Sequence, residues 1–311
     1  MSRLAIVIAA QGNVPHLESG LVSVLEHRPP QCEIWIVLDA PYDDPYGLEG
    51  EVRFLHAGPH AGLAQSVNLA LEHCEAPLVH LLGCGVEVSD GWADRALPHF
   101  SDPRVAAVAS RALSADDRRT VHSLGVRYPA AGVSAGGGSR RFARQAAGCL
   151  GPSSLAGFYR AAVLRALGGL CPAVGDGWAD VDLALSLRGL GMKNVCEAES
   201  IVFAPAVKPS RVTAKDRGLH AERLYRRHTT ADESALRHAL AWAADGWQAP
   251  LCWLGRLAAR AEGQSHSRHS SRLLELRETL VAPLVAAGRI DPAHGSLQPA
   301  TAGRVRQEFA A

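Results

Sequence analysis

Residues 33–40 read EIWIVLDA, an apolar run of strand length that ends in a carboxylate, Asp39. A similar run, LAIVIAA, covers residues 4–10, and the segment between the two has apolar residues at helical spacing. Continuous apolar strands are typical of parallel sheets buried on both faces, and a strand, a helix and a second strand form the unit that builds such sheets. This stretch therefore predicts the beginning of an α/β domain.

The same alternation continues along the chain. A strand at 51–57, a helix at 62–74 and a strand at 77–83 follow, which predicts a mostly parallel sheet flanked by helices, with right-handed crossovers. Residues 129–152 are rich in Gly, Ala and Arg and predict an irregular loop. Strand and helix patterns then return, and only helical patterns remain after Pro205. We expect an α/β domain over residues 1–207 and a helical C-terminal extension over residues 208–311.

The composition disfavours several classes of protein. The 311 residues include 32 Lys and Arg against 31 Asp and Glu, so no overall charge attracts nucleic acid. No apolar run reaches the about 18 to 20 residues that cross a membrane, and the N-terminal run is too short for a secretion signal. The seven cysteines are scattered without a CxxC pair, which predicts reduced thiols and no zinc site. We expect a cytoplasmic protein that neither binds nucleic acid nor spans a membrane.

Asp39 is the first candidate site residue. Ligands of open parallel sheets bind beyond the carboxyl ends of the strands, and a carboxylate there can accept hydrogen bonds from a ribose or a nucleoside. The nearby Asp43 and Asp44 lie between Pro41 and Pro45, so a turn without a binding role is the alternative. The position of Asp39 at a strand end favours the binding role.

A second acidic group lies in residues 175–183, GDGWADVDL, where Asp176, Asp180 and Asp182 surround the predicted start of a helix. The N-terminus of a helix stabilises negative charge, so capping explains part of this group. A general base also gains from a helix that holds it rigidly at the edge of the sheet. From these residues alone both interpretations stay open.

The order of the segments is more informative than any one of them. A strand ending in Asp39, then HAGLAQSVN at 60–68, GCGVEVSDGW at 83–92 and GWADVDLALSLRGLGMK at 177–193 follow one another at plausible spacing. This order resembles the inverting family 2 glycosyltransferases of GT-A fold, over about residues 4–230. The resemblance implies a nucleotide-sugar donor and an acceptor whose identity the sequence does not name.

The resemblance also implies roles for individual residues. The aspartate that contacts the nucleotide falls on Asp39, and a further donor-binding segment falls on His60, Gly62 and Asn68. The acidic helix motif makes Asp180 the general base, which takes the proton of the acceptor hydroxyl, with Asp182 assisting or capping. Gln11, in the segment after the first strand, is also expected to contact the substrate.

The metal-binding motif of that family is missing. Its Asp-x-Asp falls on Gly83, Cys84 and Gly85, and glycine supplies no side-chain oxygen for Mg²⁺ or Mn²⁺. A substitute ligand, Glu87 or Asp90, is the least favoured explanation, because strand alternation points Glu87 elsewhere. We expect no metal and no other cofactor.

Two explanations for the missing motif remain. In one, Arg140, Arg141 and Arg211 neutralise the diphosphate leaving group, since a guanidinium grips phosphate with two hydrogen bonds; exposed loop arginines without a ligand are the alternative. In the other, catalysis is lost and the chain binds a sugar nucleotide or a glycan, or serves as a scaffold. Removal of the metal without replacement slows transfer by roughly a thousandfold, so a half-equipped enzyme is disfavoured.

Two further features bear on function. The first strand is followed by AAQGNVPH, not by the G-x-G-x-x-G of a dinucleotide-binding oxidoreductase. The C-terminal extension contains Trp242, Trp247 and Trp253. Indoles favour membrane surfaces and protein interfaces, so these predict contact with a membrane surface or a protein partner, or packing of the extension onto the sheet domain.

Overall fold

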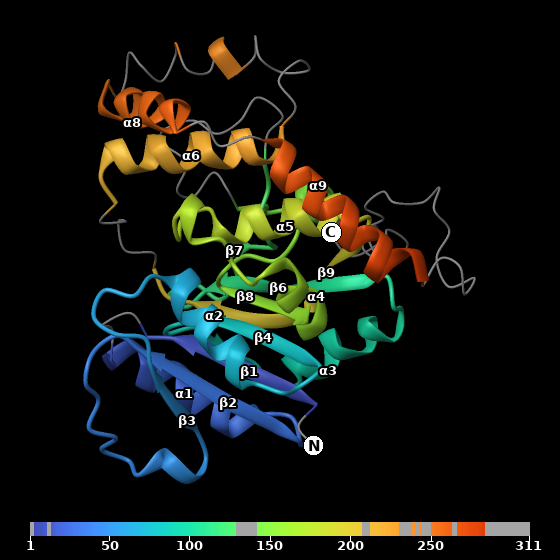
Figure 1. The fold of residues 1–311 in the computed structure, drawn as a ribbon. Coiled ribbons are helices and arrows are strands. Elements are labelled where there is room, and N and C mark those ends of the chain that lie inside the picture. Colours follow the sequence, from blue (N-terminus) through green and yellow to red (C-terminus); the bar gives the residue numbers. More distant parts are fainter. Residues whose placement is uncertain are drawn as a thin grey trace, which may run out of the picture.

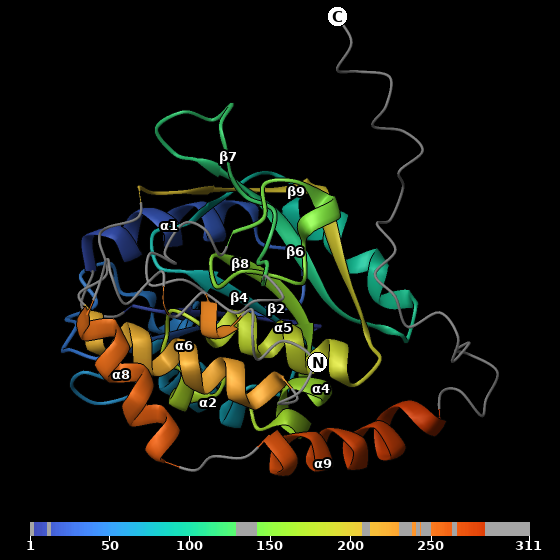
Figure 2. The same cartoon turned by 90° about the horizontal axis from the view of Figure 1, so that it is seen from above.

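A computed structural model describes residues 3–10, 14–128, 142–206, 212–229, 238–240, 243, 250–262 and 266–283. These residues form a nine-stranded sheet with helices on both faces (Figures 1 and 2). The sheet has the order β3-β2-β1-β4-β8-β6-β9-β5, and β7 pairs with β6. The strands are β1 (Leu4–Ala9), β2 (Cys32–Leu38), β3 (Arg53–His56), β4 (Leu78–Gly83), β5 (Glu87–Val88), β6 (Val105–Ser114), β7 (Val121–Ser123), β8 (Ala156–Arg160) and β9 (Lys193–Ala204).

The first four strands are parallel, which confirms the prediction for the N-terminal part of the chain. Ala9 at the end of β1 lies beside Val37 of β2 and beside Gly83 of β4. Since parallel strands end at the same edge, the segments after β1, β2 and β4 meet there. The remaining half is mixed, because β8 runs antiparallel to both β4 and β6, while β6 and β9 are parallel.

The strands alternate their side chains between two hydrophobic cores, as buried strands must. In β1, Leu4, Ile6 and Ile8 pack on the side of α1 (Val14–His27) and α3 (Trp92–Ala96), and Ala5 and Val7 face the opposite core. That second core is built from α2 (Leu63–His73), α4 (Ala161–Leu167) and α5 (Ala179–Gly189). Both sheet faces are therefore covered, as the continuous apolar strands predicted.

After β9, the described residues form helices. Helix α6 (Ala214–His228) packs on α5, α8 (Pro250–Ala261) lies on the outer side of α6, away from the sheet, and α9 (His266–Leu276) runs over α5 (Figure 1). A turn of wider π-type helix, Arg277–Val281, continues α9. Within the described ranges, no helix combines the length and the hydropathy that a membrane crossing requires.

The expectation of reduced thiols is wrong for two of the seven cysteines. A disulfide joins Cys149, which precedes β8, to Cys196 in β9, across 47 residues of sequence. The scattered spacing gave no sign of this pair, because the two residues come together through the pairing of β6 with β9 and the path of the chain between β7 and β8.

Candidate functional site at the carboxyl edge of the sheet

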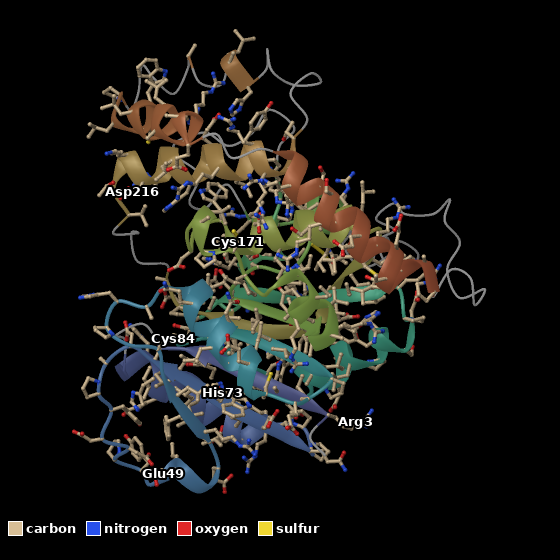
Figure 3. All side chains as sticks on the ribbon, viewed as in Figure 1. Arg3, Glu49, His73, Cys84, Cys171 and Asp216 are labelled. Carbon is tan, nitrogen blue, oxygen red and sulfur yellow. A yellow bond between two sulfur atoms is a disulfide. The ribbon has the colours of Figure 1, made fainter. Side chains whose placement is uncertain are left out.

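Asp39 and the glycine turn after β4 lie at the same carboxyl edge of the parallel strands, with the end of β1 between them. Asp39 follows β2, and Cys84 follows β4; Cys84 is labelled at this edge in Figure 3. Burial raises the pKa of the Cys84 thiol to about 11, and the negative charge of Asp39 adds to the shift. A negative charge at the same edge disfavours the thiolate, so Asp39 and burial act on the pKa of Cys84 in the same direction.

The glycine turn is closed by helix α1. The N–H of Gly83 donates to the carbonyl oxygen of Leu155 at 2.8 Å. Gly85 has a left-handed φ of 79°, and a Cβ placed on it would lie 2.9 Å from the Cβ of His16 in α1. A Cβ on Gly20 would likewise lie 3.0 Å from the carbonyl oxygen of Val86. An aspartate at position 85 therefore has neither a relaxed backbone conformation nor room for its side chain.

Glu87 faces away from this turn. It belongs to β5, and its carboxylate pairs with the guanidinium of Arg118 at 3.5 Å. Asp90 is exposed beyond the same strand. In the part of the chain that the structure describes, no three or more His, Cys, Asp and Glu side chains gather in a way that could hold a metal ion.

Asp180 lies in the first turn of α5 and is almost completely buried, with 2% of its surface exposed. One carboxylate oxygen accepts a hydrogen bond from the N–H of Ser154 and the other from the N–H of Val181, each at 2.9 Å. The carboxylate lines a small cavity of about 10 Å³ together with Tyr159 of β8. Burial raises the pKa of the Tyr159 phenol, and the charge of Asp180 raises it further, so this phenol remains a neutral neighbour of the acid.

Asp182 points in another direction and connects two helices. Its Oδ1 lies 2.7 Å from Nε2 of His228 and 2.8 Å from Nε of Arg227, both at the end of α6. The ring of His228 in turn packs edge-on against that of His269 in α9. The contacts of Asp182 therefore attach α6 and α9 to the helix that carries Asp180.

Asp176 lies between α4 and α5, against the start of α2, and is half-buried. Its Oδ1 accepts a hydrogen bond from the N–H of Ala64 at 3.3 Å, and a Cβ on Gly62 would lie 2.8 Å from the same oxygen. The imidazole of His220 packs against Gly175 so closely that a Cβ there would overlap it. Burial and the charge of Arg223 lower the pKa of His220, and Asp216 and Asp176 act in the opposite direction.

Gly62 and Asn68 thus have contacts that the sequence did not reveal. Gly62 is the N-cap residue directly before α2 and leaves room for the carboxylate of Asp176. The amide of Asn68 donates to the carbonyl oxygen of Leu170 at 2.9 Å and accepts from its N–H at 2.8 Å. Asn68 therefore positions the loop that leads from α4 to the acidic helix.

Four of the predicted substrate-binding residues, Gln11, Arg140, Arg141 and Arg211, lie outside the described residues. In addition, three residues at the site carry no signal in the sequence. Ser154 acts through its backbone N–H and His16 through the position of its Cβ. His220 lies in α6, more than 35 residues beyond the acidic motif. Every residue type except proline has a backbone N–H and every type except glycine has a Cβ, so a pattern of residue types cannot single out such contacts.

Comparison with known proteins gives similarities in sequence and in fold. No protein-family model matches the chain. A stretch of 72 residues is 36% identical to the pre-mycofactocin glycosyltransferase of Mycobacterium tuberculosis (strains CDC 1551 / Oshkosh and H37Rv), and it covers 23% of this chain but 15% of that relative's length.

The structure is similar to the mannosyltransferase PcManGT from Pyrobaculum calidifontis, solved with GDP-Man and Mn²⁺. The TM-score is 0.52 at 17% identity, over 93% of this chain and 81% of that one. It is also similar to GalNAc-T7, solved with UDP, GalNAc and Mn²⁺, with a TM-score of 0.53 at 11% identity, over 78% of this chain and 54% of that one. The fold is the GT-A fold. In this GT-A domain Asp39, the Gly83–Gly85 turn and Asp176 line the carboxyl edge, and Asp180 lies buried behind them.

Both of these solved proteins hold Mn²⁺, but in this chain the side chains of the turn after β4 do not fit a divalent cation. Gly83 and Gly85 present no side-chain oxygen, Glu87 is paired with Arg118, and α1 fills the space that a carboxylate at position 85 would need. Mg²⁺ and Mn²⁺ require hard oxygen ligands, and the turn supplies none from its side chains.

Proposed function

We propose that this chain transfers a sugar from a nucleotide-sugar to an acceptor hydroxyl with inversion, without a divalent cation at the Gly83–Gly85 turn. The observation that carries the proposal is the close packing of His16 on Gly85, which leaves no room for a metal-ligating carboxylate at position 85. Asp39, the proposed nucleoside contact, remains at the carboxyl edge of the sheet. The name of the curated relative supports a glycosyltransferase, and the GDP-Man and UDP of the two solved proteins support a nucleotide-sugar donor.

The proposed reaction is a single displacement. Asp180 takes the proton of the acceptor hydroxyl while the hydroxyl oxygen attacks the anomeric carbon. The bond from that carbon to the diphosphate oxygen breaks, and its electron pair leaves with the nucleoside diphosphate, so the configuration inverts. The two backbone N–H groups on Asp180 support this role because they fix the orientation of its carboxylate.

The charge that develops on the leaving diphosphate needs a partner other than a metal ion. Arg140, Arg141 and Arg211 are the proposed partners, since guanidinium groups bind phosphate through paired hydrogen bonds and stay charged at neutral pH. Asp39 is the proposed contact of the nucleoside. Asp182 is proposed to support the reaction from a distance, by holding α6 and α9 against α5.

A second candidate is a GT-A domain that binds a sugar nucleotide or a glycan without transfer, or that serves as a scaffold. The burial of Asp180 favours it, because a carboxylate with 2% exposure and an N–H on each oxygen must be uncovered before it can reach an acceptor. The transferase and the non-catalytic binding domain would bind the sugar nucleotide at the same edge of the sheet, and only the transferase would turn it over.

Calorimetric titration with UDP-, GDP- and dTDP-sugars, first in EDTA and then in Mn²⁺, tests the proposal. We expect one donor class to bind equally well in both buffers and to release its nucleoside diphosphate when acceptor or water is present. Binding that requires Mn²⁺ contradicts the metal-independent reaction. Binding without release of the nucleoside diphosphate favours the second candidate, and no donor binding in either buffer favours a scaffold.

A further inference from the structure

Helix α8 has two faces of unusual character. The face that packs on α6 contains Cys252, Gly255, Arg256 and Ala259, all buried. The opposite face is exposed and apolar, with Leu251, Trp253, Leu254 and Leu257 at 57%, 43%, 50% and 38% exposure. Surface helices normally place their apolar stripe inward and their charges outward. In α8 the basic Arg256 lies inside, and large apolar side chains face outward.

The packing of α8 on α6 fixes this orientation. A Cβ on Gly255 would overlap the carbonyl oxygen of Lys215, and a Cβ on Gly218 would overlap that of Cys252, so the two backbones touch at this crossing. Farther along, Arg260 donates to the buried carboxylate of Glu222 at 3.2 Å. Rotation of α8 about its axis would break both contacts, so this packing directs the apolar face away from α6.

The surroundings of this face are basic. Together α6, α8 and the residue that follows α8 contain seven Lys and Arg residues and three Asp and Glu residues. Arg256 is buried, and Arg223, Arg227 and Arg260 pair with Glu262, Asp182 and Glu222. The third acid, Asp216, accepts a hydrogen bond from the hydroxyl of Thr213 at the start of α6. Across the described residues, no carboxylate forms an ion pair with Lys215 or Arg217, which are both exposed.

We propose that the α8 face, defined as Leu251, Trp253, Leu254 and Leu257, binds the surface of an anionic lipid bilayer, with Lys215 and Arg217 toward the headgroups. An exposed helix face of Leu and Trp inserts into the interface between headgroups and acyl chains, and neighbouring Lys and Arg side chains are attracted by anionic lipids. This excess of positive charge distinguishes a lipid surface from an uncharged apolar partner. The inference holds whether or not the GT-A domain transfers sugar.

Flotation of the full chain with vesicles tests the proposal. We expect binding to vesicles of phosphatidylcholine mixed with phosphatidylglycerol, weak binding to phosphatidylcholine alone, and release by salt. Leu254→Glu should lower the bound fraction about tenfold, since it removes one inserted side chain and adds a negative charge. Leu274→Glu on α9 is the matched control, because Leu274 is 60% exposed and lies outside the α8 face; it should bind like the unchanged chain.

Circular dichroism of each variant establishes that it folds. Lys215→Glu changes the charge without changing the apolar face, and it should also lower the fraction of protein that floats with anionic vesicles. Equal binding by Leu254→Glu and Leu274→Glu would overturn the proposal, as would failure of the unchanged chain to float with anionic vesicles. Light scattering that finds a dimer of the unchanged chain and a monomer of Leu254→Glu would also overturn it, because the face would then join two copies of the chain.

Discussion

The backbone N–H of Ser154 donates a hydrogen bond of 2.9 Å to the carboxylate of Asp180. The next residue, Leu155, accepts a hydrogen bond from the N–H of Gly83. The loop before β8 thus connects the buried acid of α5 to the glycine turn after β4. A displacement of Ser154 and Leu155 would therefore change the surroundings of both Asp180 and the Gly83–Gly85 turn.

Asp180→Asn separates catalysis from donor binding. We expect turnover to fall by about 10²- to 10⁴-fold, the usual contribution of a general base, while the donor affinity measured by calorimetry stays the same. An asparagine keeps one acceptor for the N–H of Ser154 or Val181, so the fold should persist. Asp176→Asn is the companion variant; turnover that survives Asp180→Asn but is lost in Asp176→Asn would transfer the role of base to Asp176.

Gly85→Asp should not restore a metal site. The left-handed backbone and the Cβ of His16 oppose any side chain at this position. We therefore expect the free energy of unfolding in urea to fall by about 1 to 3 kcal/mol. We also expect no measurable binding of Mn²⁺. Gly50→Asp is the control, because a Cβ there meets nothing within 4 Å, and it should leave stability nearly unchanged. Tight Mn²⁺ binding by Gly85→Asp would contradict the steric argument.

Asp182→Ala should weaken the attachment of α6 rather than the chemistry. Removal of the carboxylate leaves the buried His228 and the partly buried Arg227 beside each other without their common partner, which costs about 3 kcal/mol in the free energy of unfolding. Urea denaturation of the single variants and of the double variant with His228→Ala gives the coupling between the two residues. Additive losses in that cycle would show that the contact contributes little.

His80 should make stability fall as the solution becomes acidic. It is fully buried, stacked on Phe158, and its Nε2 accepts the indole N–H of Trp92 while its Nδ1 donates to the carbonyl oxygen of Gly157. Burial lowers its pKa to about 3, against the weaker opposing effect of the Gly157 carbonyl.

Acidification destabilises the folded protein because the unfolded chain binds a proton at His80 more tightly than the folded protein does. The unfolded chain takes up a proton at His80 near pH 6.5 and the folded protein does not until about pH 3, so stability present above pH 6.5 is lost on acidification, by at most about 1.4 kcal/mol per pH unit. We expect the free energy of unfolding, measured with urea between about pH 7 and 4, to fall less steeply with decreasing pH in His80→Gln than in the unchanged chain. Parallel slopes would mean that His80 is not the group that titrates.

Alkylation of Cys84 reports on Asp39. The thiol has a pKa of about 11, so iodoacetamide should modify it slowly near pH 8. Asp39→Asn removes a negative charge and should raise the rate a few-fold, as measured by mass spectrometry of the peptide. The rate at Cys32, at the opposite end of β2, is the internal control. An unchanged rate at Cys84 would show that Asp39 does not influence this thiol.

The early part of the fold was predictable because buried parallel strands leave a clear pattern. The runs at 4–10, 33–40 and 77–83 became β1, β2 and β4, and the helical spacing between the first two became α1. The disulfide of Cys149 and Cys196 was not predictable, because the neighbours of β9 in the sheet decide which cysteines meet. The contacts of Asp182 with Arg227 and His228 were not predictable either, because the packing of α6 on α5 brings these residues together across more than 40 residues of sequence.

The sequence by itself determined the α/β class, the GT-A resemblance and the absence of carboxylates at positions 83 and 85, because all three depend on which residue types follow one another along the chain. Only the tertiary structure decided that α1 closes over Gly85, that Asp180 is buried under two backbone N–H groups, and that the apolar side chains of α8 face outward. These depend on distances between segments far apart in sequence, which packing sets and local residue order does not.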